Sequence, residues 1–177
     1  DRTVTGVQTC ALPISEEYLT KWCKMHNVIL GILRPSLLAG KGAPGNLGAM
    51  VNGVKKGYYL NIAGGRAVKS ILMAEDIARI MPALVKKGGV YNVCDTFQPT
   101  FGQISESVAN QLGKRKPMSI PMWMAKCMAF VGDFLGSKVP INSYKLEKMT
   151  KNLTFSNEKA RKELGWEPLD VLTNYKI

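Results

Sequence analysis

Residues 28–38 read VILGILRPSLL, and the first part of this stretch, 28–33, is a continuous apolar run. Such a run is typical of a strand that is covered on both faces, as in a parallel sheet. Pro35 lacks a backbone N–H and predicts the end of this strand. The stretch therefore predicts an α/β fold that is built on a buried parallel sheet.

Strands and helices alternate on both sides of this stretch. Apolar runs and helical periodicity predict these elements: helix 16–26, helix 47–56, strand 58–62, strand 67–73, helix 76–87, strand 90–93 and helix 101–112. Gly88-Gly89 and Gly113 follow two of the helices, as expected of helix ends. The alternation is the signature of an α/β sheet.

The character of the sequence changes after Lys116. A short strand is expected over 118–120, then a helix rich in Met and Trp, and then helices over 143–150 and 157–164, the last with Ser156 as its N-cap. The Met- and Trp-rich segment 121–135 is too short to span a bilayer, which takes about 20 apolar residues. We expect it to be a buried or lid-like helix.

Net charge and cysteine content limit the kinds of partner and compartment that the sequence predicts. The 177 residues carry a net charge of +11, which favours an anionic partner such as a phosphate-bearing ligand, nucleic acid or a membrane surface without choosing among them. Lysines and arginines are scattered in pairs, so solvated faces are the better reading than a nucleic-acid stripe. Outside residues 1–14, Cys23, Cys94 and Cys127 form no C-x-x-C pair, which predicts a reduced, cytoplasmic protein without a metal site.

Two motifs match catalytic patterns in letters only. The glycines of 40–45 satisfy G-x-G-x-x-G, but Pro44 removes one amide and no acidic residue follows about 20 positions later, so we expect a flexible loop. Tyr144 and Lys148 satisfy Tyr-x-x-x-Lys, but a late, highly charged helix predicts an exposed face instead. His26, the only histidine, is expected at a helix end. The residues alone therefore indicate no catalytic centre.

The first residues look foreign to the rest of the chain. Residues 1–14 read DRTVTGVQTCALPI, and 4–14 can be written without a break as the codons of a common sequencing-library adapter. We interpret this segment as a translated adapter and exclude it from fold reasoning, with a natural Thr/Val-rich strand as the alternative. The natural protein is then expected to begin near Ser15 or Glu16, part-way through a gene.

Several segments, in the same order, resemble the extended short-chain dehydrogenase/reductase family, which contains the nucleotide-sugar epimerases and dehydratases. The segments are 28–38 with Arg34-Pro35, 44–47 (PGNL), 68–78 (VKSILMAEDIA), 89–93 (GVYNV), Lys159-Ala160 and 164–168 (LGWEP). Together they cover nearly all of 15–177. Each segment alone is weak, but their common order makes the resemblance specific.

The resemblance implies a C-terminal portion of a Rossmann-like parallel sheet plus the small substrate-binding lobe. Residues 15–177 then form a C-terminal fragment of an NAD-dependent epimerase/dehydratase domain. The family's glycine fingerprint and its catalytic Tyr-x-x-x-Lys would lie upstream of Ser15, so no catalytic residue is expected in this chain. The fragment alone is expected to be inactive.

Some site residues can be carried over from the family. Pro35, Ser36 and Leu37 would border the nicotinamide of NAD or NADP, largely through backbone groups. Asn46 and Leu47 would contact the nucleotide diphosphate.

Two further residues match the family's substrate site. Asn61, with Ala63 on the same strand face, would approach the base. Lys69 stands where the family usually has an arginine that clamps the pyrophosphate, and lysine keeps the charge but loses the bidentate fork. Ser70 and Met73 replace the usual acidic residue and histidine, so the resemblance does not carry over one specific substrate.

The resemblance implies hydride transfer between sugar C4 and a bound nicotinamide, with a nucleotide-diphosphate sugar as the partner. A 4-epimerase is the preferred reading, and a 4-keto reductase or dehydratase of the same family is the alternative. A non-catalytic binding or scaffold protein is the alternative from another class. The full-length enzyme is expected to be a homodimer, with neither nucleic acid nor a membrane as partner.

Overall fold

The computed structural model of the chain describes residues 6–43, 45–135 and 142–177. The helices are α1 (Gly6–Met25), α2 (Gly45–Lys56), the 3-10 turn η1 (Ala63–Gly65), α3 (Ala74–Lys87), α4 (Phe101–Gln111), α5 (Met122–Leu135), α6 (Ser143–Thr150), α7 (Glu158–Leu164) and α8 (Val171–Asn174). The strands are β1 (Gly31–Pro35), β2 (Leu37–Ala39), β3 (Asn61–Ile62), β4 (Ile71–Met73), β5 (Gly89–Val93) and β6 (Ser119–Ile120).

The strands of the described residues form three parallel pairs. β1 pairs with β5, β2 with β4, and β3 with β6. The predicted parallel α/β architecture is confirmed, although the sheet is divided into short ladders. The expected strands at 58–62 and 67–73 are correspondingly shorter in the structure.

The first strand differs in its bounds from the sequence prediction. It begins at Gly31 rather than Val28, because Val28 and Ile29 are exposed rather than covered on both faces. Pro35 belongs to the strand as its last residue, where a missing N–H removes little of the ladder. Leu37 then starts a second strand, β2, that the sequence analysis did not predict.

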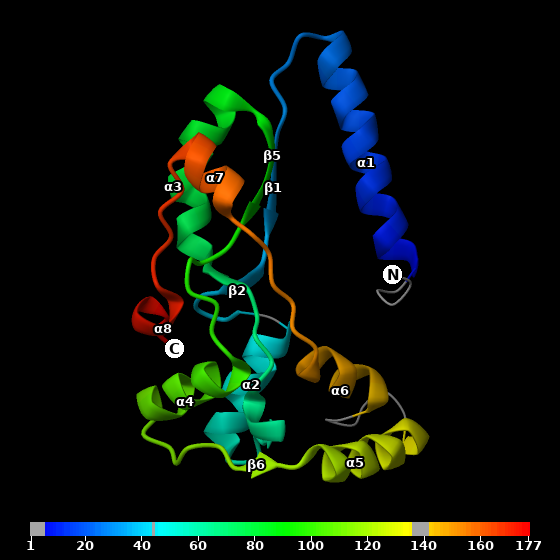
Figure 1. The fold of residues 1–177 in the computed structure, drawn as a ribbon, viewed down its shortest axis with the longest axis vertical. Helices are drawn as coiled ribbons and strands as arrows, with labels where there is room; N and C mark the ends of the chain where they lie inside the picture. Colours follow the sequence, from blue (N-terminus) through cyan, green and yellow to red (C-terminus); the bar gives the residue numbers. More distant parts are fainter. Residues whose placement is uncertain (1–5, 44, 136–141) are drawn as a thin grey trace.

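One layer of the molecule consists of β1 and β5 with helices beside them. Figure 1 shows α3 and α7 on one side of this strand pair and α1 standing on the other side. The layer has its own apolar core, made of Leu72, Ile80, Leu84, Tyr91, Val93, Ala160 and Trp166. On the other side, the guanidinium of Arg34 donates to the carboxylate of Glu16 and so links β1 to α1.

The remaining helices form a lobe below this layer (Figure 1). One core joins β2, β4, α2, α4 and α8, and its largest fully buried members are Leu47, Met50, Ile71, Ile104, Val108 and Val171. A smaller core joins β3, β6, α5 and α6 through Ile62, Ile120, Ala125, Ala129 and Leu146. A Rossmann-like layer with a smaller lobe is the arrangement that the resemblance implied.

Helix ends follow the sequence with some corrections. α4 begins with a reciprocal capping box, in which Gln103 N donates to Thr100 Oγ1 and Thr100 N donates to Gln103 Oε1. Ser156 was expected as the N-cap of the helix over 157–164, but the N-cap position of α7 is Asn157 and the helix begins at Glu158, whose N–H still donates to the hydroxyl of Ser156. α1 begins at Gly6 rather than Glu16; residues 1–5 of the expected adapter segment lie outside the described residues.

The short helix α8 was missed by the sequence analysis. The side chain of its N-cap, Asp170, accepts from the backbone N–H groups of Leu172 and Thr173.

α5 was expected to be a buried or a lid-like helix, and the structure contradicts the buried alternative. Its small residues Ala125 and Ala129 are buried, whereas Trp123 is 68% exposed and Phe130 is 64% exposed. Within the part of the chain that the structure describes, no helix is long and apolar enough to cross a membrane.

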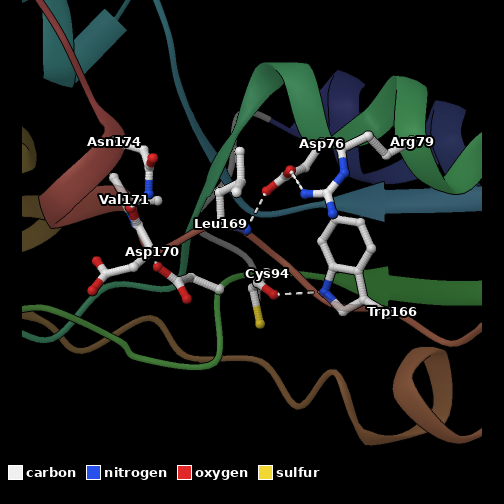
Figure 2. A network of polar contacts seen from close by, with 9 residues as sticks. Asp76, Arg79, Cys94, Trp166, Leu169, Asp170, Val171 and Asn174 are labelled. Carbon is white, nitrogen blue, oxygen red and sulfur yellow. Dashed lines mark hydrogen bonds and ion pairs between the residues drawn. The ribbon is translucent and has the colours of Figure 1, made fainter.

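Buried carboxylates attach the C-terminal segment to the first layer (Figure 2). Asp76 is fully buried at the start of α3; it accepts from the N–H of Leu169 at 2.8 Å and pairs with Arg79 at 2.8 Å. The indole N–H of Trp166 donates to the carbonyl of Cys94 at 2.9 Å. These contacts explain structurally why the 68–78 and 164–168 segments carry the Asp and the Trp that they do.

Candidate functional site

The predicted cofactor residues lie where β1 ends and β2 begins. Ser36 N donates to Val93 O at 3.1 Å, and Leu37 N donates to Ser70 O at 3.2 Å, so both residues are held by neighbouring parallel strands. The carboxyl ends of parallel strands are the usual place of ligand sites in open α/β sheets. Pro35 is exposed at this edge.

Ser36 carries an unsatisfied polar atom at this edge. Its hydroxyl oxygen is buried and has no hydrogen-bond partner within 6–43, 45–135 and 142–177. A buried hydroxyl without a partner is costly, and a ligand with amide or hydroxyl groups would supply one. The position therefore fits the carboxamide or ribose side of a nicotinamide cofactor.

A pocket of about 460 Å³ opens in the lobe. It is lined by Asn46, Ala49, Met50, Tyr58, Tyr59, Leu60, Phe101, Met128, Lys145 and Met149. The lining is mostly apolar and aromatic, with an amide and a cation, which is the usual composition of a small-molecule site. Burial raises the pKa of the Tyr59 phenol to about 12, so this side chain stays protonated at neutral pH.

The predicted diphosphate residues Asn46 and Leu47 have different surroundings. Asn46 lines the pocket from the first turn of α2, which contains no acidic residue. The backbone N–H groups of a helix start and the positive end of its dipole favour an anion. Leu47 is fully buried in the core, so only its main chain could contact a ligand.

The predicted base-binding residue Asn61 has its side chain occupied by α4. Asn61 is 5% exposed, its Nδ2 donates to Ser105 Oγ at 3.0 Å, and its Oδ1 accepts from Ser105 Oγ at 3.1 Å. Its side chain thus attaches β3 to α4. The preceding residue, Leu60, lines the pocket.

Lys69 is a buried lysine rather than a surface one. It is 6% exposed, and its ammonium group donates to the main-chain carbonyls of Lys148, at 2.9 Å, and Lys151 at the end of α6. The ammonium nitrogen also lies 5.3 Å from the ring centroid of Phe101, which lines the pocket. Burial lowers the pKa of Lys69. Since an ammonium has three donor hydrogens, two of them hold α6.

Ser70 and Met73 are buried and contribute to the packing of the fold. Ser70 is buried, and its hydroxyl accepts from the N–H of Phe155 at 2.8 Å. Met73 is buried in the lobe core just before α3. Neither residue lines the pocket.

The defining residues of the motifs that the sequence analysis set aside do not line the pocket. Tyr144 is 44% exposed on α6, and the ammonium of Lys148 lies over its ring rather than at its hydroxyl. His26 Nδ1 lies 2.8 Å from the carbonyl oxygen of Trp22 at the end of α1. Residues 40–43 form a loop, and Pro44 lies outside the described residues. Among the described residues, no group of three or more His, Cys, Asp or Glu could hold a metal.

The pocket includes residues that sequence reasoning did not select, notably Tyr58, Tyr59, Phe101 and Lys145. The two tyrosines belong to the expected strand 58–62, although the observed β3 begins only at Asn61, and this strand prediction is the one local signal that could have marked them. Lys145 belongs to α6, far from Asn46 in sequence, so its position follows only from how α6 packs. The sequence predicted the edge at Pro35 and one wall at Asn46, and the fold supplies the other walls.

Solved structures of other proteins share this fold. No protein-family model and no curated protein matches the chain. Among solved structures, UDP-N-acetylglucosamine 4-epimerase from Bacillus cereus matches 96% of this chain and 50% of that chain, with a TM-score of 0.66 and 15% identity. UDP-glucose 4-epimerase from Thermotoga maritima, solved with UDP-glucose, matches 91% and 48%, with a TM-score of 0.62 and 19% identity.

The chain has the fold of the C-terminal part of a nucleotide-sugar epimerase. It spans about half the length of the solved structures that it matches. A dTDP-glucose 4,6-dehydratase from Bacillus anthracis in complex with NAD shares the fold at a TM-score of 0.54 and 18% identity, over 84% of this chain and 42% of that one. The predicted epimerase/dehydratase fold is thereby confirmed. An epimerase fold assigns no role to single residues, so the site residues stay predictions.

Proposed function

We propose that this chain is the substrate-binding part of a nucleotide-sugar 4-epimerase. The observation that carries the proposal is the pocket between α2, α4 and α6, which combines aromatic walls with cationic and amide groups. The rings of Tyr58 and Phe101 offer apolar faces to a nucleobase. Asn46 at the start of α2 and the nearby charge of Lys145 suit a diphosphate.

The predicted cofactor residues 35–37 and the pocket are connected through the strand pair β2 and β4. Leu37 is bonded to Ser70, and Lys69, the residue before Ser70, lies over Phe101 in the pocket wall. A sugar attached to a diphosphate in the pocket would thus extend towards Pro35–Leu37. A nicotinamide cofactor bound there supplies reversible hydride transfer at sugar C4. In the proposal, residues 35–37 border that cofactor and the pocket holds the nucleotide.

The chain's own residues would orient the substrate rather than move protons. Asn46 would hold the diphosphate, and Lys69 would fix the end of α6 beside it through the carbonyls of Lys148 and Lys151. A 4-keto reductase or dehydratase would use the same binding parts. The products of the parent enzyme separate these activities. A reductase consumes NAD(P)H stoichiometrically, whereas an epimerase and a dehydratase have no net consumption of the cofactor, and of these two only the dehydratase removes water from the sugar.

The binding part of the proposal can be tested on this chain by titration calorimetry with UDP. We expect Asn46→Ala to weaken UDP binding about tenfold, the effect of one lost hydrogen bond of roughly 1.4 kcal/mol. The matched control is Asn110→Ala, an exposed asparagine on α4 that does not line this pocket. Absence of UDP binding by the folded chain, or equal weakening in both variants, would contradict the proposal.

A further inference from the structure

In helix α5 the small side chains are buried and the large apolar side chains are exposed, which is the reverse of the usual arrangement. Ala125 and Ala129, four residues apart, are buried in the core shared with α6. Trp123 and Phe130 lie on the opposite side of the helix and are 68% and 64% exposed. An apolar helix of a water-soluble protein normally buries its large side chains. The exposed side of α5 therefore needs an apolar covering.

The exposed surface extends beyond α5 into the segment before β6. Its large apolar members, called the α5 face here, are Met118, Trp123, Phe130 and Val131, whereas Met128 of the same helix lines the pocket. Met118 is the most exposed of them, at 73%. In Figure 1, β6 leads into α5 at one end of the molecule. Several large exposed apolar side chains gathered in one region mark an interaction site.

Positive charge borders the α5 face. Residues 114–116 (Lys-Arg-Lys) directly precede Met118, and Lys126 is exposed on α5 itself. Lys116 is paired with Glu106 at 2.7 Å. The acidic residue of α5, Asp133, has its carboxylate engaged by Ser143, whose N–H donates to Asp133 Oδ1 at 3.0 Å. Asp133 stays ionised at neutral pH, because hydrogen bonds from the hydroxyl and the N–H of Ser143 lower its pKa. The local balance is positive, since Lys114, Arg115, Lys116 and Lys126 outnumber Glu106 and Asp133.

We propose that the α5 face and residues 114–116 dock on an anionic lipid surface. A helix with Trp and Phe on one side and Lys or Arg beside it is typical of helices that lie in the membrane interface, where Trp is favoured. α5 has 14 residues and would lie on the bilayer rather than span it. The basic residues would contact anionic headgroups.

Charge favours lipid over a second copy of this chain as the partner of the α5 face. A two-fold contact through the α5 face would bring residues 114–116 and Lys126 of both copies together, and like charges oppose such an interface. A lipid surface instead matches both the apolar and the cationic parts. The sequence analysis expected no membrane partner because segment 121–135 is too short to span a bilayer, and the proposal replaces that expectation with docking on the bilayer surface.

Vesicle flotation of the whole chain tests the proposal, since protein aggregates do not float with lipid. The probe is a vesicle of phosphatidylcholine and phosphatidylglycerol in about a two-to-one ratio. We expect Trp123→Gln and Phe130→Gln each to weaken binding about tenfold or more, as expected for one buried aromatic side chain. The matched control is Val85→Gln, because Val85 is 65% exposed on α3, away from the α5 face.

A second pair of variants tests whether the basic residues 114–116 contribute to lipid binding. Lys114→Gln with Arg115→Gln should weaken flotation and reduce its dependence on salt. The control, Lys86→Gln with Lys162→Gln, removes the same charge from α3 and α7 and should leave the variant close to the wild-type chain. Equal binding to pure phosphatidylcholine, no flotation at all, or a dimer that Trp123→Gln dissociates would each overturn the proposal.

Discussion

The ammonium nitrogen of Lys69 lies 2.9 Å from the main-chain carbonyl oxygen of Lys148, at the C-terminal end of α6. The same ammonium also donates to the carbonyl of Lys151. The last carbonyls of a helix lack partners within the helix, and a cation there satisfies them. A residue that the family resemblance assigns to the pyrophosphate is thus also the attachment of α6 to β4.

This attachment predicts a stability effect. Lys69→Met should lower the free energy of unfolding by about 2 kcal/mol, because two carbonyls lose a charged donor. Lys86→Met, on the exposed surface of α3, should change it by less than about 0.5 kcal/mol. Urea unfolding measures both variants. Equal stability of the two variants would show that Lys69 does not hold α6.

Asp76 predicts a local effect at the C-terminal segment. Asp76→Ala leaves the N–H of Leu169 and the guanidinium of Arg79 without their carboxylate, and should cost about 1–3 kcal/mol. Hydrogen exchange at the Leu169 amide should accelerate more than exchange in α4. Glu75→Ala, an exposed acidic neighbour in the same helical turn, serves as the control and should leave Leu169 protected.

Two glycines with the same backbone angle should respond differently to alanine. Gly65 and Gly165 both have a φ of +64°. A Cβ on Gly65 would lie 2.6 Å from the backbone nitrogen of Gly102, whereas one on Gly165 meets nothing within 4 Å. Gly165→Ala should cost about 1–2 kcal/mol for the left-handed backbone alone.

Gly65→Ala adds a backbone clash to the same conformational cost, so its loss should exceed that of Gly165→Ala by roughly 1–3 kcal/mol. Thermal unfolding of both variants gives the comparison. Similar losses would show that η1 can move away from the start of α4.

The phenol of Tyr59 predicts a pH dependence. Burial raises its pKa to about 12, against about 10 for an unfolded tyrosine. The folded chain then holds this proton where the unfolded chain has released it, so the stabilising contribution is complete below about pH 10 and is lost as pH rises towards about 12.

Tyr59→Phe should therefore make stability fall less steeply with pH in that window. The difference in phenolate absorbance between the wild-type chain and Tyr59→Phe during an alkaline titration isolates this group among the six tyrosines, and the same titration in urea gives the unfolded reference. A Tyr59 that ionises near pH 10 in the folded chain would contradict its burial in the pocket wall.

Sequence patterns predicted those parts of the fold that depend on local signals. The apolar run at 28–33 and the glycines after α3 and α4 act within a few residues, and the structure contains the expected strand and helices there. Strand limits were less predictable, since Val28 and Ile29 are apolar yet exposed.

The misread features depend on contacts between distant segments. The buried positions of Asp76 and Lys69 arise from Leu169 and from the end of α6, which lie 93 and about 80 residues away in sequence. The outward side of α5 follows from Ala125 and Ala129 packing on α6, which periodicity alone does not reveal because both sides of the helix are apolar. The pocket walls contributed by Tyr58, Phe101 and Lys145 are of the same kind.

The most direct test of the central claim, that residues 15–177 are the C-terminal part of a nucleotide-sugar epimerase, is to sequence the source DNA across the Ser15 codon. The account predicts that the reading frame continues upstream with a helix carrying Tyr-x-x-x-Lys and, further back, a glycine-rich turn after a first strand. Genomic DNA that encodes Asp1 to Ile14 behind a start codon would contradict it and would favour a binding or scaffold role.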